Sequence, residues 1–268
     1  MCYVVPLCYS PLIPSMNIDL SGKLAVVTGA NGQLGRTMVR TLAECGADVA
    51  IHYHSKAEKV RELEAELKKA GRRAGIFQAD ITDIKSVMSM RDAINASLGK
   101  PDIIVTNAVA QYKWTTVLEQ APADYESQFK TCVLQNVLMA QAFVPAMIEK
   151  KWGRVIGINT ECVMQLQPSQ SAYVSGKRGM DGVMKILARE VGPHQVTVNQ
   201  VAPGWTISDR DREKGTERSP EYEKNVALRR RGTDADIANA VAFLASDLAG
   251  FITGAFIPVC GGYVMPAI

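Results

Sequence analysis

The feature that most constrains the fold is an alternation that begins at Lys23 and continues through most of the chain. Short runs of apolar, often β-branched residues alternate with longer segments in which apolar residues recur at helical spacing. This pattern is typical of repeated β-α-β units, because neighbouring parallel strands need a long crossover between them. Seven runs have strand character, at 24–28, 48–53, 74–78, 102–106, 154–158, 196–201 and 255–259. The sequence therefore predicts an α/β fold, with one doubly wound parallel sheet of about seven strands and helices on both faces.

The segments between these runs have the patterning of helices that cover a sheet. In 56–70, Val60, Leu63 and Leu67 share one face of a helix, and 234–247 repeats the arrangement. Both segments are interpreted as packing helices. With 268 residues, the chain is long enough for a single domain with a large buried core.

The organised pattern defines one domain, predicted to span residues 17–268. Residues 1–16 are apolar and contain three prolines, but they lack the basic residues that open a signal peptide. We therefore predict a flexible N-terminal extension that neither targets the chain nor spans a membrane. Segment 206–231 is densely charged and has no clear period, so it is interpreted as a long surface excursion.

Charge and cysteine content narrow the functional classes. Thirty Lys and Arg residues against 27 Asp and Glu residues give a formal charge of +3, which is too small for an extended nucleic-acid-binding surface. The six cysteines have no metal-ligand spacing and form no Cys-x-x-Cys pair, which disfavours zinc and a disulfide framework and fits a cytoplasmic protein. His52 and His54 invite a metal-binding interpretation, but a polar strand end explains them more simply. We predict no metal, no nucleic-acid partner and no membrane partner.

Small or polar residues follow six of the predicted strands. They are the turn at 28–35, Tyr53-His54, Asp80, Asn107, Thr160 and Pro203-Gly204. In open parallel sheets ligands bind beyond the carboxyl ends of the strands, so these residues mark the predicted binding edge.

The turn after the first strand has the composition of an anion-binding loop. Its sequence, TGANGQLG at 28–35, places glycines where a strand passes into a helix. Glycines let the backbone approach a diphosphate, whose charge then meets the amides at the helix N-terminus. Glycines needed only for a tight turn are the alternative explanation. The position of this loop after the first strand favours a Rossmann-type dinucleotide-binding domain.

Taken in order, these motifs resemble the classical short-chain dehydrogenase/reductase family, and the resemblance extends from Ser21 to Gly262. The residues that carry it are the loop 28–35, Asp80 in QADITD, Asn107 in TNAV, Tyr173 and Lys177 in YVSGK, Pro203-Gly204, and the closing TGAFIPVCGG. The chain is most similar to the branch around 3-oxoacyl-carrier-protein reductases and sugar or polyol dehydrogenases, which the sequence does not separate.

The resemblance implies an oxidoreductase that interconverts a carbonyl and an alcohol by hydride transfer, with Tyr173, Lys177 and Thr160 as catalytic residues. The cofactor-binding residues that it indicates are Gly29, Asn31, Gln33, Leu34, Gly35, Arg36, Tyr53, His54, Ser55, Asp80, Ile81, Asn107, Ala108, Tyr173, Lys177, Pro203 and Gly204. The substrate would be a small carbonyl or alcohol, enclosed by a lid over about 205–231. Trp114, Met164 and Trp205 would form apolar pocket walls, and a homotetramer or homodimer is expected.

The spacing of Tyr173 and Lys177 has a chemical use. Four residues apart on a helix, the two side chains project from one face. An ammonium about 4 Å from the phenol favours the phenolate by up to roughly 4 kcal/mol at an effective dielectric of about 20. We therefore predict that Lys177 lowers the pKa of Tyr173, so that the phenol can give a proton to a carbonyl oxygen or take one from an alcohol.

Four residues depart from the family pattern. Thr160 replaces a serine, Cys132 falls where the family has a helix asparagine, Gln33 replaces the middle glycine of the loop, and Val109 replaces the last glycine of the NNAG segment. Asn136, one turn after Cys132, is a possible substitute for the asparagine. These departures motivate a second hypothesis, a dinucleotide-binding sensor or scaffold with weak or lost catalysis. A serine hydrolase is disfavoured because the chain has no Gly-x-Ser-x-Gly motif.

Residues after the second strand indicate the cofactor. Members that prefer NAD carry an acidic residue there, which accepts hydrogen bonds from the ribose and repels a 2′-phosphate. This chain has Tyr53, followed by His54, Ser55 and Lys56, and Arg36 comes after the loop. This neutral-to-positive environment favours NADP(H) over NAD(H).

Overall fold

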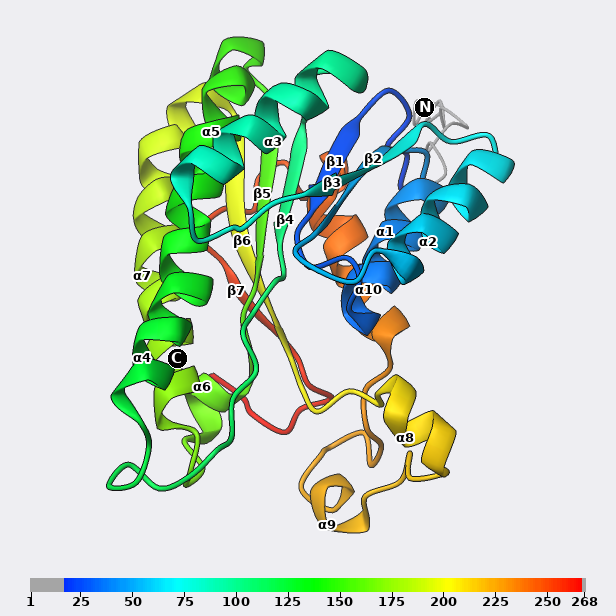
Figure 1. Ribbon diagram of the computed structural model, residues 1–268. Coiled ribbons are helices and arrows are strands. Elements are labelled where there is room, and N and C mark those ends of the chain that lie inside the picture. Colours follow the sequence, from blue (N-terminus) through cyan, green and yellow to red (C-terminus); the bar gives the residue numbers. More distant parts are fainter. Residues whose placement is uncertain (1–16, 267–268) are drawn as a thin grey trace, which may run out of the picture.

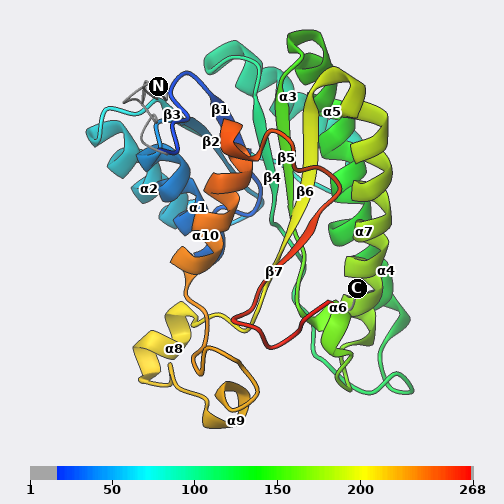
Figure 2. The same ribbon diagram turned by 180° about the vertical axis from the view of Figure 1, so that it is seen from behind.

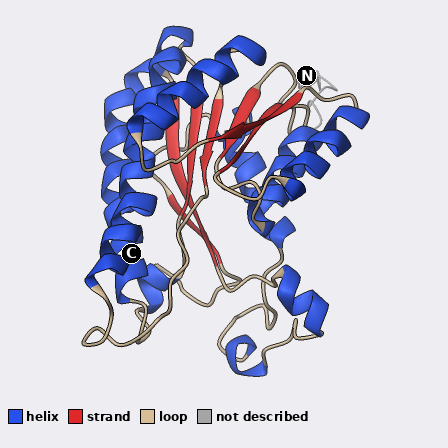
Figure 3. Cartoon of the chain, viewed as in Figure 1, coloured by secondary structure: helices blue, strands red, loops and turns tan. Residues whose placement is uncertain are grey.

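The protein, described from a computed structural model over residues 17–266, forms one seven-stranded sheet (Figures 1 and 3). The strands are β1 (Leu24–Val27), β2 (Asp48–Tyr53), β3 (Ala74–Gln78), β4 (Ile103–Thr106), β5 (Gly153–Ile158), β6 (Val196–Pro203) and β7 (Phe256–Val259). Their order is β3-β2-β1-β4-β5-β6-β7, and every neighbouring pair is parallel. The predicted doubly wound sheet is confirmed. The predicted extension at 1–16 lies outside the described residues.

Helices cover both faces of the sheet, as Figure 2 shows from the opposite side. One face carries α1 (Gln33–Glu44), α2 (Glu58–Lys69) and α10 (Asp234–Ala245). The other carries α3 (Ile84–Ser97), α5 (Gln135–Lys150) and α7 (Ser171–Val191). Shorter elements are α4 (Pro122–Gln128), α6 (Cys162–Gln165), α8 (Asp209–Lys214), α9 (Pro220–Glu223), a π-helical turn at Phe129–Leu134, and 3-10 turns at Gly192–His194 and Asp247–Ala249.

The core consists of two apolar layers separated by the sheet. Strand β1 illustrates the division, because Ala25 and Val27 belong to one layer and Leu24 and Val26 to the other. Successive strand residues point to opposite faces, so a strand covered on both sides is largely apolar on both of them. This explains why the strands appear in the sequence as continuous apolar runs.

A helical run at Pro122–Lys150 is 29 residues long, and its length and hydropathy alone would allow it to cross a membrane. Half of its most apolar window is buried in the protein. Met139, Phe143 and Met147 from this run belong to the core layer between α5 and the sheet. Their burial explains the high hydropathy as that of a core helix.

The charged segment predicted as an excursion projects beyond the carboxyl ends of the strands, where Figures 1 and 2 show α8 and α9. A buried arginine organises it from within. The Arg231 guanidinium, 2% exposed, donates to the backbone carbonyls of Thr206, Thr216 and Glu217 and to the Asp211 carboxylate. Arg231 is therefore a structural residue of this excursion.

Candidate active site

The turn between β1 and α1 is shaped by two glycines. Gly29 has a φ of 64°, in the left-handed region that glycine tolerates. A Cβ on Gly35 would lie 2.5 Å from the Gly29 carbonyl oxygen, so only glycine lets the helix start this close to the loop. The predicted glycine-rich loop therefore has a steric requirement for glycine at both positions.

The N-terminus of α1 fits an anionic ligand. Gly32 is its N-cap, no side chain caps the helix, and its first turn contains no acidic residue. The first amides of a helix lack partners within the helix, and its dipole favours a negative charge at this end. The loop and helix end together suit the diphosphate of a dinucleotide.

Side chains from two other elements brace the loop. The Thr28 hydroxyl donates to Gln135 Oε1 over 2.6 Å and accepts from the backbone amides of Asn107 and Ala108. The Asn107 carboxamide donates to the carbonyls of Thr28 and Gly29 over 3.0 and 3.3 Å. Asn107 and Ala108, both predicted to bind the cofactor, thus lie directly against the loop.

His52 is a site residue that the sequence analysis did not identify. Its Nδ1 accepts from the Gly29 amide and its Nε2 lies 3.0 Å from the Ala79 carbonyl, so the ring joins the loop to the end of β3. Burial lowers the pKa of His52 to about 4, so the ring is neutral at pH 7. The signal available in the sequence was a histidine at an inward position of a buried strand.

Gln33, which replaces a family glycine, connects the loop to the excursion. Its Nε2 donates to the Ile207 carbonyl and to Asp234 Oδ1, both over 2.6 Å, and its Oε1 accepts from the Asp209 amide. Arg36 forms an ion pair with Asp209. The structure therefore places Gln33 and Arg36 in contacts with the excursion, and the Arg36 charge is already paired.

The residues after β2 lie at the surface. His54, Ser55 and Lys56 are exposed, and the Asn31 carboxamide donates to the Ser55 carbonyl over 3.2 Å. Asp80 is exposed after β3, where one carboxylate oxygen accepts from the Thr82 amide and hydroxyl. Tyr53 is half-buried at the end of β2, and Ile81 is buried.

Tyr173 and Lys177 project from α7 toward the carboxyl end of β5. Lys177 is 3% exposed, and its ammonium donates to the Ile158 carbonyl over 2.5 Å. The same ammonium lies 5.8 Å from the centroid of the Tyr173 ring. Thr160 follows β5 and is buried, and its hydroxyl accepts from the Cys162 amide. The structure thus brings the three predicted catalytic residues together.

The prediction that Lys177 lowers the pKa of Tyr173 is wrong for this arrangement. Burial raises the pKa of the Tyr173 phenol, the Cys162 and Cys132 thiols add to the rise, and the Thr160 hydroxyl opposes it. Burial also lowers the pKa of Lys177. The physical reason is that burial destabilises the phenolate by more than the Lys177 ammonium stabilises it, because this ammonium already donates to the Ile158 carbonyl.

Cys132 lies in the π-helical turn before α5 and is fully buried. Its thiol donates to Gln128 Oε1 over 3.6 Å. Asn136 accepts from the Thr106 hydroxyl and donates to the Cys132 carbonyl, each over 2.6 Å, so its carboxamide is committed to buried contacts. Asn136 does not line the cavity and is therefore not the substitute for the asparagine.

A cavity of about 520 Å³ opens beside these residues. Its lining includes Leu34, Asn107, Tyr173, Lys177, Pro203 and Gly204 from the predicted cofactor set, with Thr160, Val109, Trp114 and Trp205. Met164, predicted as a pocket wall, is not among the lining residues. Helix α6 turns Glu161, Cys162 and Gln165 toward the cavity, so the neighbouring Met164 points elsewhere.

Aromatic residues from distant segments complete the cavity wall. Tyr112 accepts a hydrogen bond from the Tyr173 amide over 2.7 Å, and Trp114 stacks on the Tyr173 ring at 5.8 Å. Tyr222 and Tyr263 stack at 5.0 Å on the far side. Of these residues, Tyr263 was not predicted, and its only sequence signal is an aromatic residue after two glycines. Within residues 17–266, no three His, Cys, Asp or Glu side chains gather in a metal-binding cluster.

Comparison with known proteins agrees with this geometry. The family model described as enoyl-(acyl carrier protein) reductase matches residues 29–264. The 3-oxoacyl-[acyl-carrier-protein] reductase of Staphylococcus aureus is 33% identical over 243 residues, which are 91% of this chain and 98% of that protein. The Pseudomonas aeruginosa protein of the same name is 32% identical over 248 residues, covering 92% of this chain and 100% of that protein.

Solved structures give the same result. A blue fluorescent protein from a metagenomic library, in complex with NADPH, is 33% identical with a TM-score of 0.85, covering 92% of this chain and 100% of that one. A double mutant of a Serratia marcescens short-chain dehydrogenase/reductase is 29% identical with a TM-score of 0.83, covering 91% of this chain and 98% of that one. The similarity therefore extends over about nine tenths of the chain.

The environment of His52 predicts a specific pH dependence of stability. Its pKa is about 4 in the folded chain against 6.5 as the ordinary value, so only the unfolded state is protonated between these values. The stabilisation is complete above pH 6.5 and is lost as the pH falls toward 4. We expect the advantage of the wild type over His52→Asn in urea unfolding to shrink by about 2 kcal/mol from pH 7 to pH 5.

The matched control is His54→Asn, which changes an exposed histidine in the same strand end. Its effect on the free energy of unfolding should be small, because the side chain is exposed. An advantage over His52→Asn that stays constant between pH 7 and pH 5 would contradict the assignment of a neutral, buried His52.

Proposed function

This chain belongs to the short-chain dehydrogenase/reductase family, and on that basis we propose that Tyr173 is the general acid/base of an NADP(H)-dependent oxidoreductase. The reaction is the interconversion of a carbonyl and an alcohol by hydride transfer. The observation that carries the proposal is one cavity lined by Tyr173, Lys177 and Thr160 together with Asn107 and Gly204 from the cofactor edge. The substrate and the dinucleotide can then meet at the phenol.

Each catalytic residue has a role that its contacts support. The Thr160 hydroxyl accepts from the Cys162 amide, so its hydrogen is available to bind a carbonyl oxygen. The Tyr173 phenol gives its proton to that oxygen in reduction and takes it back in oxidation. Lys177, held by the Ile158 carbonyl, is positioned to bind the nicotinamide ribose. When bound, the nicotinamide donates or accepts the hydride.

Burial of the phenol favours one protonation state at neutral pH. Because the pKa of Tyr173 is raised, the phenol carries its proton, as reduction of a carbonyl requires. Oxidation of an alcohol needs the phenolate, and its population grows as the pH rises. The alternative of a sensor or scaffold without catalysis is not favoured, since the phenol, the ammonium and the Thr160 hydroxyl share the cavity.

The choice of NADP(H) is supported by the surface after β2. Lys56 and His54 are exposed there, and Tyr53 occupies the position at which NAD-preferring members carry an acid. Arg36 is paired with Asp209, so Lys56 is the cation best placed to receive a 2′-phosphate. The NADPH-bound relative supports the same choice.

The excursion at 205–231 is proposed as the substrate lid. Trp205 and Tyr222 belong to it and line the cavity, and Trp114 approaches from the other side. Gln33, in the glycine-rich loop, bonds to Ile207 and Asp209 near the start of the lid. The same residue therefore contacts the lid and belongs to the loop proposed to bind the dinucleotide. We place the enzyme in the cytoplasm, acting on a small-molecule carbonyl or alcohol.

Replacing Tyr173 with Phe should lower kcat by about 10²- to 10⁴-fold, because the proton donor is lost while the ring remains. NADPH binding, followed by quenching of tryptophan fluorescence, should persist. For the wild type, the kcat/KM of alcohol oxidation should rise from neutral to alkaline pH, whereas that of carbonyl reduction should hold near neutrality and fall at alkaline pH.

The matched variant is Tyr125→Phe, which removes a phenol that bonds Ser171 outside the cavity. It should keep wild-type turnover. Retention of more than a tenth of the activity by Tyr173→Phe, or no turnover of any ketone by a cofactor-bound wild type, would refute the proposal.

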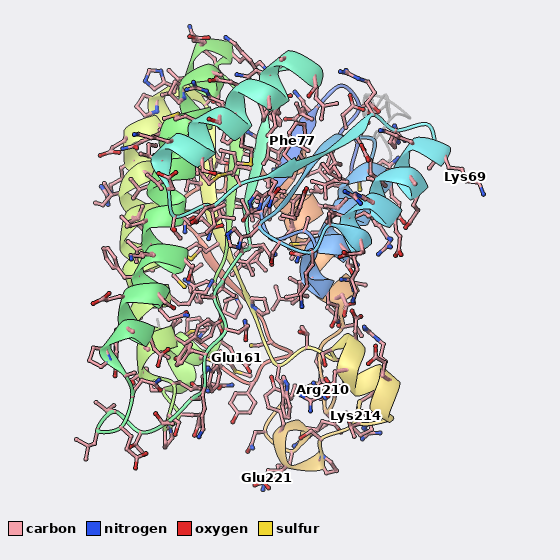
Figure 4. The ribbon with its side chains drawn as sticks, in the orientation of Figure 1. Lys69, Phe77, Glu161, Arg210, Lys214 and Glu221 are labelled. Carbon is pink, nitrogen blue, oxygen red and sulfur yellow. The ribbon has the colours of Figure 1, made fainter. Side chains whose placement is uncertain are left out.

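Replacing Lys56 with Glu should weaken NADPH binding about tenfold or more and leave NADH binding unchanged or improved. A carboxylate in place of an ammonium repels a 2′-phosphate but not a ribose hydroxyl. Dissociation constants for both dinucleotides measure this. Lys69→Glu, at the opposite end of α2 (Figure 4), makes the same charge change and should leave both constants unaltered. An unchanged NADPH-to-NADH ratio in Lys56→Glu would rule out the role of Lys56.

A homotetramer is proposed on the resemblance to the family. Two features of the described chain are suited to it: β7 pairs only with β6 and so leaves an open sheet edge, and Ile186 on α7 is 58% exposed. Light scattering on purified protein should give four times the chain mass of 29.1 kDa, or twice that mass for a homodimer. A monomer at micromolar concentration would contradict the proposal.

A further inference from the structure

We infer that the substrate carries a hydroxyl group on the carbon next to the reacting carbonyl, and that Glu161 accepts a hydrogen bond from this hydroxyl. The inference rests on the proposed function and names its substrate class: α-hydroxy ketones or aldehydes in reduction, and vicinal diols or polyols in oxidation. Glu161 would then be a specificity-determining residue rather than a catalytic one.

One oxygen of Glu161 has no hydrogen-bond partner in the described chain. The side chain lines the cavity and is only 3% exposed, just after the end of β5 (Figure 4). Its Oε1 accepts from the Tyr222 hydroxyl over 2.7 Å, but no group within residues 17–266 completes a hydrogen bond to its buried Oε2. A buried acceptor without a donor is costly, so a bound ligand is the expected source of the missing donor.

The backbone fixes Glu161 beside the reacting centre. It directly follows Thr160, whose hydroxyl is placed to bind the carbonyl oxygen, and consecutive Cα atoms lie about 3.8 Å apart. The Glu161 amide donates to the Pro203 carbonyl over 2.9 Å, and its own carbonyl accepts from the Gln165 amide. Because Thr160 and Glu161 are consecutive and both line the cavity, we place the hydroxyl on the carbon next to the carbonyl.

The neighbouring wall suits hydroxyl groups. Gln165, Gln167 and Gln170 line the cavity, and Gln170 Oε1 is a second buried oxygen without a donor among the described residues. Carboxamides offer both donors and acceptors, and a hydroxyl can satisfy both at once. An ammonium only donates, so it would leave the carboxamide N–H groups unmatched.

The charge of the cavity disfavours an anionic substrate. Among its described lining residues, only Lys177 and Glu161 carry charge, and the Lys177 ammonium is bonded to the Ile158 carbonyl. Arg231, which stacks on the lining Trp205, and Arg212 are already paired, with Asp211 and Asp234. A carboxylate or phosphate would therefore meet Glu161 without a compensating cation, whereas a neutral hydroxyl would not be repelled.

The state of the carboxyl is consistent with this assignment. Burial raises the pKa of Glu161, and the rise is only partly opposed by the Tyr222 hydroxyl and by the nearby Gln165 carboxamide and Trp205 amide, neither of which completes a hydrogen bond to Oε2. A hydroxyl donating to Oε2 would stabilise the carboxylate and strengthen its own binding. The missing donor and the raised pKa thus point to the same kind of ligand.

The test compares substrates that differ by one isosteric group. Hydroxyacetone and 2-butanone place a hydroxyl or a methyl group beside the same carbonyl. With NADPH, we expect the wild-type kcat/KM for hydroxyacetone to exceed that for 2-butanone by about 10- to 100-fold. Glu161→Gln presents an N–H₂ group in place of Oε2, so the ratio should collapse to within about threefold, whereas Glu126→Gln on α4, outside the cavity, should keep it.

A binding measurement separates this inference from the proposed function. Trp114 and Trp205 flank the cavity and are 45% and 50% exposed, so tryptophan quenching in the NADP⁺ complex reports on occupancy. 1,2-Propanediol should bind at least tenfold more tightly than 2-butanol, and Glu161→Gln should abolish the difference. This preference without any turnover would support the inference and refute the proposed catalysis.

Three outcomes overturn the inference while ketone reduction stands. The first is a wild-type ratio near one for hydroxyacetone against 2-butanone. The second is an unchanged ratio in Glu161→Gln, whose fold is checked by its thermal unfolding. The third is a stronger preference for aminoacetone than for hydroxyacetone, which would assign Glu161 to an ammonium group instead.

Discussion

The site depends on the hydrogen bond from the Lys177 ammonium to the Ile158 carbonyl, which joins α7 to the carboxyl end of β5. Asn159 reinforces this joint, because its carboxamide donates to the Lys177 carbonyl and its oxygen accepts from the Thr160 amide. The joint places Tyr173, one turn earlier on α7, opposite Thr160. If α7 shifted along its axis by one turn, about 5.4 Å, the phenol and the hydroxyl would no longer face one cavity.

This joint is buried, and its burial sets the electrostatics of the cavity. Desolvation raises the pKa of Tyr173, lowers that of Lys177 and raises that of Glu161. In each case burial stabilises the neutral form relative to the charged form. A site that favours neutral groups responds strongly to the charge and hydrogen bonds that its ligands bring. The ligands, more than any pair of side chains, therefore complete the polar network of this protein.

The sequence predicted the parts of this protein whose signals are local. Buried parallel strands are largely apolar on both faces, so all seven were visible as runs, and the loop at 28–35 was visible through its glycines. Side-chain partners across the fold carry no such signal. The sequence alone does not show that His52 contacts the Ala79 carbonyl at the end of β3. It also does not show that Glu161, rather than the apolar Met164, faces the cavity. The prediction of the site was limited because contacts between residues distant in the sequence leave no local pattern.

The proposed lid and the acceptor at Glu161 are parts of one arrangement. Tyr222, from α9 of the lid, donates to Glu161 and accepts from the Trp205 amide over 2.9 Å, and its ring stacks on Tyr263 near the C-terminus. Gln33 links the base of the same lid to the cofactor loop. These contacts meet at Trp205 and Ile207, close together at the start of this segment, so the glycine-rich loop and the Glu161 carboxylate are linked through one short stretch of backbone.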